Sequence, residues 1–284
     1  MNLRQVKRKT KSIGNVKKIT KAMQLVSAVK MKKAQQLAIE GRAYRESLDK
    51  IIAKVMPSAD KDASALLSAK GKGTRKLIIF VSSNKGLCGP FNVNLFRLLL
   101  KNIDFHNADF ISIGKKGSSF VLRMGSKVIA DYSLTNPLLE TSAIFELVIQ
   151  NFFSGAYKEV QLVYNTFIST LRSDPSIETL LPFVRKEDVP EADKTFEYLI
   201  EPSPEELIEK LLMSYLEEKI RGALMNSEAV EHSSRMIAMK NATDNANDVI
   251  YNLTQLGNKL RQEKITNELL DMITAKESVE GNSN

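Results

Sequence analysis

The stretch VIYNLTQLGNKL, which runs from Val249 to Leu260, carries apolar residues at steps of four, three and four. The same steps resume after a short phase change, so that the full set is Val249, Leu253, Leu256, Leu260, Ile265, Leu269 and Met272. This spacing is typical of the seam of a coiled coil and predicts a long α-helix that packs on a partner.

The predicted helix begins far upstream of this stretch. Ser203 is placed as its N-cap and Pro204 as its first residue, and no further proline follows. Only Gly222 and Gly257 weaken the pattern. At about 1.5 Å per residue, a helix over residues 204–276 would be roughly 110 Å long. A domain of this size cannot bury such a helix within itself, so we expect a partner along its length.

Upstream of Val249 the seam passes through small and polar residues as well as apolar ones. Its positions are Leu216, Ile220, Ala223, Ser227, Val230, Ser234, Ile237 and Asn241. Small seam residues let two helices approach closely but bury little area each. The segment NATDNAND, from Asn241 to Asp248, is polar on nearly every face. It either faces solvent or is held within a larger polar assembly.

A second long helix is predicted over residues 3–56. Its apolar residues recur at threes and fours with a gap at Thr10. They are Leu3, Val6, Ile13, Val16, Ile19, Met23, Val26, Val29, Ala34 and Leu37. Because the two long helices lie at opposite ends of the chain, we expect them to form an antiparallel pair. The alternative is a solvated basic helix, which fits most of its charges.

The middle of the chain predicts an α/β domain, because short apolar runs typical of buried strands alternate with helical patterns. The predicted strands are 76–83, 109–114, 127–132, 159–168 and 175–184. We expect the fold class α/β, with a long antiparallel coiled coil of the N- and C-terminal helices plus a central doubly wound α/β domain. The expected divisions are a first long helix at 1–57, a linker at 58–75, the α/β domain at 76–200, a second long helix at 201–276 and a polar tail at 277–284.

Positive charge is concentrated at the amino end of this 284-residue chain. The net charge is +8, and residues 1–33 carry eleven Lys and Arg and no acid. Such a segment indicates an acidic partner surface: nucleic acid, anionic lipid or an acidic protein. Cys88 is the single cysteine, so no internal disulfide is expected. We expect no membrane span and no secretory signal; a mitochondrial transit peptide is the alternative reading of the basic amino end, but the helical pattern continues through it.

The sequence contains no recognisable catalytic constellation. The turn NKGLCGPFN, from Asn84 to Asn92, follows a strand but lacks the phosphate-binding pattern GxxxxGK[ST], so it predicts a tight turn rather than a nucleotide site. His106 and His232 have no ligand-type neighbours at metal spacing, and we expect both at the surface. Cys88 is expected to be a small buried residue rather than a nucleophile. We therefore expect no catalytic residue, no cofactor and no metal.

Four stretches of the chain strongly resemble the gamma subunit of F-type ATP synthases, in matching order and spacing. They are KKITKAMQLVSAVKMKKAQ at 17–35, SSNKGLCGPFN at 82–92, SSRMIAMKNATDNA at 233–246 and RQEKITNELLDMI at 261–273. ITKAM and RMIAMKNATDNA are the most specific of these motifs. The resemblance covers nearly the whole chain.

The resemblance implies a rotor shaft without an active site of its own. In that family the two terminal helices form a coiled coil inside an alternating ring of three alpha and three beta subunits. The foot and the α/β domain rest on the membrane c ring and hold the epsilon subunit. Ion flow turns the shaft, which drives the beta subunits through their catalytic states. The resemblance implies a peripheral location on the cytoplasmic face of the bacterial inner membrane, or alternatively on the matrix side of the mitochondrial inner membrane.

The resemblance also implies contact residues. Arg261 and Gln262 match the pair that touches a beta-subunit loop, and Met23, with Lys18 and Lys21, matches the region of the first helix that faces the beta levers. Glu201 matches the foot near the c ring and epsilon subunit. The tail at 274–284, TAKESVEGNSN, departs from the short apolar tail usual in the family.

Two other functions compete with this reading. The first is a nucleic-acid-binding protein that uses the basic helix, but Tyr44 is the only aromatic residue before Phe80, so the helix has no base-stacking platform. The second is a nucleotide-dependent enzyme built on the α/β domain, which the missing phosphate motif disfavours. We expect no nucleic-acid partner.

Overall fold

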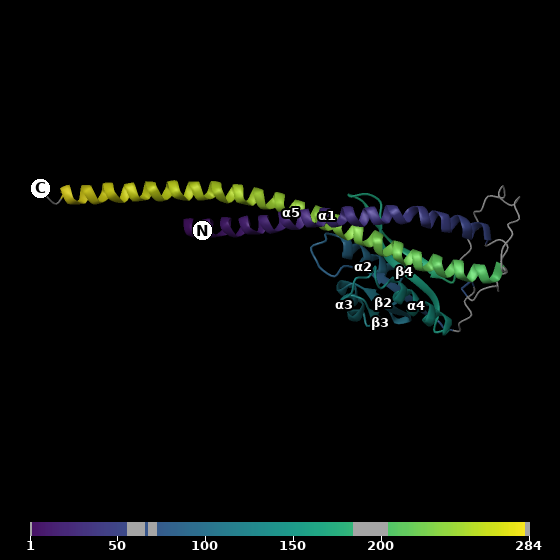
Figure 1. Ribbon diagram of the computed structural model, residues 1–284. Helices are drawn as coiled ribbons and strands as arrows, with labels where there is room; N and C mark the ends of the chain where they lie inside the picture. The colour runs from purple at the N-terminus through teal and green to yellow at the C-terminus, as the bar shows by residue number, and fades with distance from the viewer. Residues whose placement is uncertain (1, 56–65, 68–72, 184–203, 282–284) are drawn as a thin grey trace. The chain divides into compact units, whose positions relative to one another are not determined.

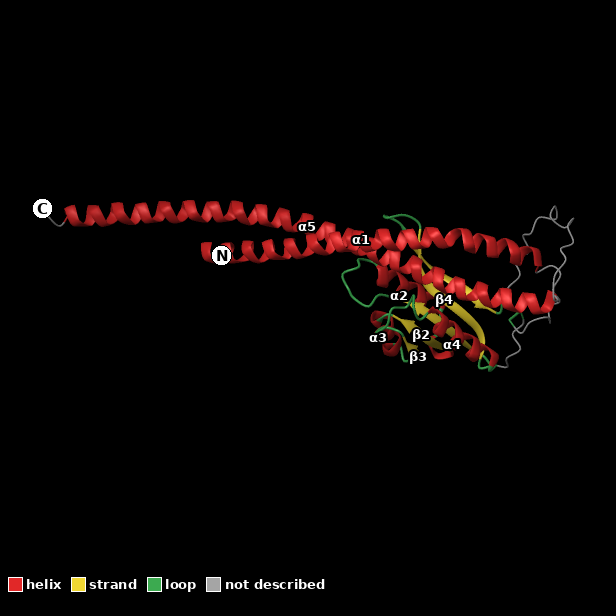
Figure 2. Cartoon of the chain, in the orientation of Figure 1, coloured by secondary structure: helices red, strands yellow, loops and turns green. Residues whose placement is uncertain are grey.

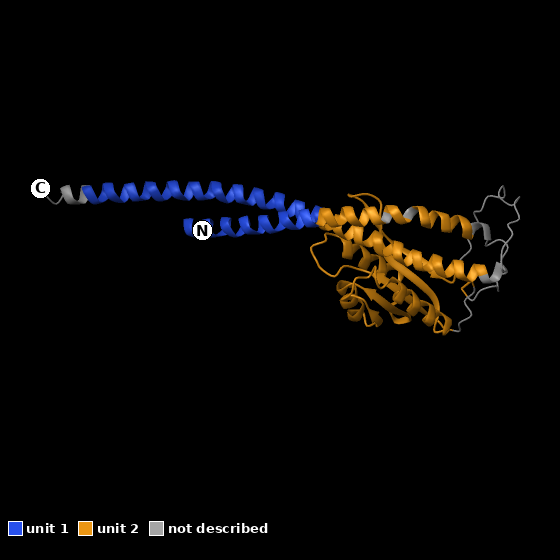
Figure 3. Cartoon of the chain, viewed as in Figure 1, with its two compact units in different colours: residues 1–26, 236–284 blue, residues 27–235 orange. Residues whose placement is uncertain are grey.

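The computed structural model describes residues 2–55, 66–67, 73–183 and 204–281. The first and last elements are two long helices, α1 (Leu3–Val55) and α5 (Pro204–Gly281) (Figures 1 and 2). The strands and shorter helices come between them in the sequence. The chain forms two compact units, coloured separately in Figure 3. Unit 1 comprises residues 1–26 and 236–284, and unit 2 comprises residues 27–235.

Unit 2 contains all the strands described. Its elements between the long helices are β1 (Arg75–Val81), α2 (Phe91–Asn102), the short 3-10 helix η2 (Phe105–Asn107), β2 (Ala108–Ile113), α3 (Lys115–Arg123), β3 (Lys127–Asp131), α4 (Thr141–Phe153), β4 (Tyr157–Phe167) and β5 (Ser173–Leu181).

The strands form one sheet in the order β3-β2-β1-β4-β5. Strand β1 is parallel to both β2 and β4, with Ile79 opposite Ile111 on one side and Leu162 on the other. Strand β3 continues the parallel set, whereas β5 pairs antiparallel with β4. The sheet therefore grows in one direction from β1 and then in the other, which confirms the predicted doubly wound α/β domain.

Helices bury both faces of this sheet. Leu77 and Ile79 of β1 belong to the core that includes α4 and residues 208–224 of α5, whereas Ile78 and Phe80 belong to the core that includes α2. The alternation follows from the two-residue period of a strand, and burial on both sides explains why β1 reads as a continuous apolar run. Of the seam positions predicted for α5 in unit 2, Leu216, Ile220, Ala223, Ser227 and Val230 are buried and Ser234 is half-buried. The apolar ones among the buried five belong to the cores of the sheet domain rather than to a coiled-coil seam.

Unit 1 is an antiparallel helix pair. The Thr20 and Thr243 hydroxyl oxygens lie 2.8 Å apart, and a Cβ built on Gly257 would lie 3.4 Å from Val6 Cγ1. Val6 precedes Thr20 on α1, whereas Gly257 follows Thr243 on α5. The two helices therefore run in opposite directions. The predicted antiparallel coiled coil is confirmed.

The seam of this pair differs from the predicted one. On α5 the inward-facing positions follow steps of three and four through Thr243, Ala246, Ile250, Leu253, Gly257 and Leu260. The prediction is right for Leu253 and Leu260 but wrong for Val249 and Leu256, which are exposed. On α1, Val16 and Ile19 are likewise exposed, while Thr20 is buried. Hydropathy misassigned the seam because its buried positions hold small and polar side chains.

Candidate functional site

The described residues contain no metal-binding group of three or more His, Cys, Asp or Glu. None of the helices in the described ranges combines the length and apolar character needed to cross a membrane. The functional candidates are therefore the surfaces of the long helices and the loop between β1 and α2.

The helix pair of unit 1 has a polar contact at its centre. Thr20 and Thr243 meet across the seam, and both residues are less than a tenth exposed. Each hydroxyl also has a backbone carbonyl within reach in its own helix, Lys17 O at 3.1 Å and Met239 O at 2.8 Å. A polar pair at a seam position favours one register over its neighbours. The contact therefore sets the alignment of α1 and α5 in unit 1.

Lys18 and Lys21 lie one turn apart on α1, and both are exposed. Lys21 Nζ donates a hydrogen bond to Gln24 Oε1 at 3.3 Å. Neither ammonium group forms an ion pair with any acid in the described part of the chain. Met23 is half-buried at the edge of the seam. Lys18 and Lys21 therefore share one exposed basic face of α1, whereas Met23, two residues after Lys21, lies on a different side of the helix.

Arg261 and Gln262 are exposed on a part of α5 that has no helix beside it. Leu260 is the last half-buried residue, and every residue from 261 to 276 is exposed. Five large apolar side chains in this segment are between 49% and 66% exposed: Ile265, Leu269, Leu270, Met272 and Ile273. Within unit 1, α5 therefore continues past the end of α1 as a single unpaired helix (Figure 3).

The two groups of predicted contact residues are not brought together. Lys18 and Lys21 flank Thr20, which is aligned with Thr243, and Arg261 follows Thr243 by eighteen residues. At about 1.5 Å per residue, Arg261 lies roughly 27 Å farther along the pair. These residues form two separate surfaces on unit 1. Glu201, the remaining predicted contact, lies outside the described residues.

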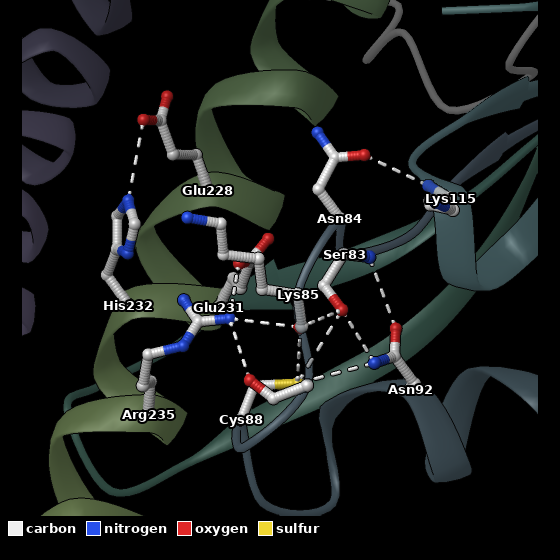
Figure 4. A network of polar contacts seen from close by, with 11 residues as sticks. Ser83, Asn84, Lys85, Cys88, Asn92, Lys115, Glu228, Glu231, His232 and Arg235 are labelled. Carbon is white, nitrogen blue, oxygen red and sulfur yellow. Dashed lines mark hydrogen bonds and ion pairs between the residues drawn. The ribbon is translucent and has the colours of Figure 1, made fainter. Parts of the chain in front are cut away.

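The loop between β1 and α2 is cross-linked by polar contacts at its base (Figure 4). The Ser83 backbone N–H donates to Asn92 Oδ1 at 3.2 Å, and Asn92 Nδ2 donates to Ser83 Oγ at 2.7 Å. Asn92 Nδ2 also lies 3.3 Å from Cys88 Sγ. Cys88 is only 3% exposed, so the prediction that it is a small buried residue is confirmed.

A buried arginine from α5 reaches the tip of this loop. Arg235 Nη2 donates to the carbonyl oxygens of Lys85 and Gly86 at 3.1 and 3.3 Å, and it contacts Glu231 Oε1 at 2.7 Å. The Arg235 side chain is 10% exposed. Figure 4 shows its guanidinium directed at the loop from the facing helix. Residues 84–87 nevertheless remain exposed to solvent.

His232 is buried, so the expectation that it lies at the surface is wrong. Its Nε2 lies 3.6 Å from Glu228 Oε1, one turn away on α5. Its Nδ1 has no hydrogen-bond partner among the described residues. The hydrogen bond from His232 lowers the pKa of Glu228, and the charges of Lys30 and Lys33 on α1 lower it further, against the opposing effect of burial. His106, by contrast, has a 96% exposed side chain, as expected.

An ion pair connects the antiparallel edge strand to α5. Lys219 Nζ donates to Glu178 Oε1 at 2.7 Å and lies 5.4 Å from the centre of the Tyr215 ring. Burial disfavours the charged ammonium, but the bond to Glu178 outweighs burial and raises the pKa of Lys219. These residues line a cavity of about 270 Å³ between the strands and the helices of unit 2. Acids and bases are mixed in its lining.

The sequence analysis missed Arg235 and Glu231 as structural residues. The spacing of Glu231 and Arg235 did indicate an ion pair, because an acid and a base four residues apart are neighbours on a helix surface. Their burial was not visible, since it depends on the loop that packs against this face of α5. The nearby Ser233, whose Oγ donates to the Thr170 carbonyl oxygen, was missed for the same reason.

Comparison with known proteins gives consistent matches over nearly the full length. A family model described as "ATP synthase" matches residues 2–279. An ATP synthase gamma chain from Akkermansia muciniphila is 34% identical over 98% of this chain and 99% of the relative. One from Methylacidiphilum infernorum is 37% identical over 96% of this chain and 97% of the relative.

Solved structures match as well. A chain from the central stalk and c-ring structure of Tetrahymena thermophila mitochondrial ATP synthase is 25% identical, with a TM-score of 0.56, over 79% of this chain and 99% of that one. A chain of the Euglena gracilis mitochondrial ATP synthase shares the fold, with a TM-score of 0.69 at 16% identity, over 99% of this chain and 96% of that one.

Proposed function

The chain belongs to the ATP synthase gamma chain family, and we infer from this premise that it is the rotor shaft of an F-type ATP synthase. It is a non-catalytic subunit. Ion flow through the membrane c ring turns the shaft, and the turning shaft drives the catalytic beta subunits through binding, synthesis and release. ATP hydrolysis drives the reverse rotation.

The observation that carries this proposal is the unpaired end of α5. Residues 261–276 are exposed throughout, although they include five large apolar side chains. Soluble proteins rarely leave such a row uncovered, so its natural environment is a partner that surrounds it. At about 1.5 Å per residue, the segment extends roughly 24 Å. We place it inside the alternating ring of three alpha and three beta subunits.

The seam of unit 1 suits a rotating shaft. Its contacts are small or polar at Thr20, Thr243, Ala246 and Gly257, so the two helices approach closely. The remaining faces carry exposed bases and scattered apolar residues rather than one continuous apolar surface. Weak, solvent-screened contacts with acidic groups can break and re-form as the shaft turns.

We assign the two surface groups of unit 1 to separate beta-subunit contacts. Lys18 and Lys21 carry positive charge that no acid in the described residues neutralises, which favours acidic groups on the beta subunits, and Met23 supplies an apolar contact on another side of the same helix. Arg261 presents five donors suited to carboxylates or carbonyls of a beta-subunit loop, and Gln262 lies beside it. Glu201, the epsilon subunit and the c ring are assigned to the foot of the rotor by family resemblance.

The location follows from the complex. The chain is a peripheral subunit of a membrane assembly, and the bacterial relatives favour the cytoplasmic face of the inner membrane. The matrix side of the mitochondrial inner membrane is the alternative.

A tagged pull-down from solubilised membranes tests the proposal. We expect one copy of this chain with three copies each of two nucleotide-binding subunits, and Mg-ATPase activity in the eluate. A control pull-down with a tagged chain truncated after Leu260 should recover less of the ring, because the unpaired segment is missing. Recovery of the full chain alone, or with nucleic acid that salt removes, would refute the rotor assignment.

A further inference from the structure

The buried histidine of α5 has one ring nitrogen without a partner. His232 is 8% exposed as a residue. Its Nε2 lies 3.6 Å from Glu228 Oε1, but its Nδ1 is buried and has no hydrogen-bond partner among the described residues. Buried polar atoms are normally paired, so an unpaired one calls for an explanation. His232 also takes no part in the contacts proposed for the rotor.

His232 lies where α5 passes α1 within unit 2. Figure 4 shows the purple ribbon of α1 beside Glu228 and His232, and the charges of Lys30 and Lys33 on α1 act on Glu228. All four residues belong to unit 2. The neighbouring helix therefore helps to cover the imidazole, and the access of water to the ring depends on how closely α1 approaches α5.

The neutral imidazole suits this position better than the charged one. In the neutral ring, Nε2–H can face the Glu228 carboxylate, which leaves Nδ1 as an unpaired acceptor. The imidazolium carries a donor on both nitrogens, and Nδ1–H would then be a charged donor in the interior with no acceptor among the described residues. An unpaired charged donor costs more free energy than an unpaired neutral acceptor.

The charged groups around His232 do not reverse this preference. They are Glu228, Glu231 and Arg235 on α5, Lys30 and Lys33 on α1, and Lys85 in the loop between β1 and α2 (Figure 4). Glu231 is engaged by Arg235 at 2.7 Å. Glu228 is the remaining acid, but its side chain is 46% exposed and it contacts only Nε2. A half-exposed ion pair contributes less than an unpaired buried charge costs.

We propose that His232 is a pH-sensitive contact that holds α1 against α5 in unit 2 while its ring is neutral. When the ring takes up a second proton, Nδ1–H needs an acceptor, and water can supply one only if α1 moves away from α5 at this level. Imidazole groups ordinarily change charge between about pH 5 and 8. Acidification within this range should therefore loosen the helix pair around residues 27–34 of α1. The contact is a property of this chain alone and does not depend on the rotor function.

Hydrogen exchange of the purified full-length chain measures this loosening. We would compare the backbone amides of residues 27–34 at pH 7.5 and pH 5.5, after correction for the effect of pH on chemical exchange itself. Exchange of this segment should be about fivefold or more faster at pH 5.5, because a buried charged donor without a partner favours the open state. The amides of β1, which lies in the middle of the sheet, should show no such change.

His232→Phe removes the group that binds the proton and keeps an aromatic ring. In this variant, exchange of residues 27–34 should be the same at both pH values. His106→Gln is the matched control, because His106 is the other of the two histidines and its side chain is 96% exposed. This control should keep the full response of the unmodified chain.

An unmodified chain that shows no acceleration at pH 5.5 would overturn the proposal, as would an acceleration that persists in His232→Phe. Circular dichroism checks that this variant is folded, and if it is not, His232→Leu takes its place with the same expectation. Loss of the response in His106→Gln would also overturn the assignment to His232, whatever either replacement of His232 does.

Discussion

Several buried positions on the two long helices are occupied by small polar residues rather than by large apolar ones. Ser27 and Thr243 are 3% and 6% exposed, whereas Val29 is 71% exposed. Small side chains fit the narrow space of a close helix pair, and their hydroxyl groups can bond to the backbone of their own helix, as Thr243 does to Met239 O. Hydropathy therefore identified the helices but only part of the faces that pack together.

Glu228 provides a test of pH dependence. Its pKa is lowered from 4.5, first by the His232 hydrogen bond and then by Lys30 and Lys33, so the folded state favours its carboxylate. This contribution is present above the unfolded pKa and is lost as pH falls through the lowered folded pKa. Glu228→Gln should thus cost about 0.2–1 kcal/mol at pH 7, because the group is partly exposed, and almost nothing at pH 3.

Urea unfolding midpoints at pH 7, 5 and 3 measure this difference. Glu263→Gln is the control, since Glu263 is exposed and makes no ion pair with the residues described. A stability gap between the unmodified chain and Glu228→Gln that stays constant from pH 7 to pH 3 would contradict the assigned cause.

Tyr157 tests the polar contacts of the sheet. Burial, together with the hydrogen bond to Asp109 Oδ2 at 2.8 Å, raises the pKa of Tyr157 to about 12. The folded state holds the neutral phenol, so its contribution is present below about pH 10 and is lost as pH rises toward 12. Burial also raises the pKa values of Tyr132, Tyr164 and Tyr215, so ultraviolet titration should show several tyrosines that ionise late, with Tyr157 among them. Tyr157→Phe should remove one phenol from the absorbance change near pH 12, and an unchanged amplitude there would contradict the assignment.

The sheet was easier to predict than the helix pair. Strands β1 and β2 are buried on both sides, so the apolar run at 77–81 and the segment at 109–113 stand out in the sequence. In unit 1 the helices touch through several small residues, and none of these stands out in the apolar pattern of the sequence. Gly257 illustrates this point: it reads as a weak position in a helix, but it lies against Val6 where the two helices approach closely.

Glycine substitutions test that close approach. A Cβ at Gly257 would meet Val6 Cγ1 at 3.4 Å, which is ordinary contact, so Gly257→Ala should stabilise the helix by about 0.5–1 kcal/mol. Gly257→Leu should lower stability by about 1–3 kcal/mol because the longer side chain forces the helices apart. Gly14→Ala is the control, since nothing lies within 4 Å of its added Cβ, and it should stabilise the helix similarly. Thermal unfolding by circular dichroism measures all three; a stabilised Gly257→Leu would refute the close contact.

Family motifs predicted the identity of the whole molecule better than any structural pattern. The family suggested by the ITKAM and RMIAMKNATDNA motifs is the family of relatives that are 34% and 37% identical over nearly the full chain. The residues that contact other subunits remain predictions. Lys18, Lys21, Arg261 and Gln262 are exposed in this chain, and their partners lie on other chains. Arg235 became visible only through the fold, because its role depends on a loop 150 residues away in the sequence.

Arg261→Ala tests the assignment of the unpaired helix. ATP synthesis driven by an ion gradient should fall about fivefold or more through loss of a charged hydrogen bond to a beta subunit, while recovery of the assembled complex changes little. Lys259→Ala, an exposed neighbour, should have a much smaller effect. Normal synthesis with normal assembly in Arg261→Ala would remove this residue from the contact surface.

Direct observation of rotation tests the rotor function itself. The alpha and beta subunits of the purified complex would be fixed to a glass surface, and a bead would be attached to an exposed position of this chain. On addition of Mg-ATP we predict stepwise rotation of the bead in one direction, which stops when ATP is exhausted. ATP hydrolysis with a bead that stays fixed would contradict the conclusion that this chain is the rotor shaft.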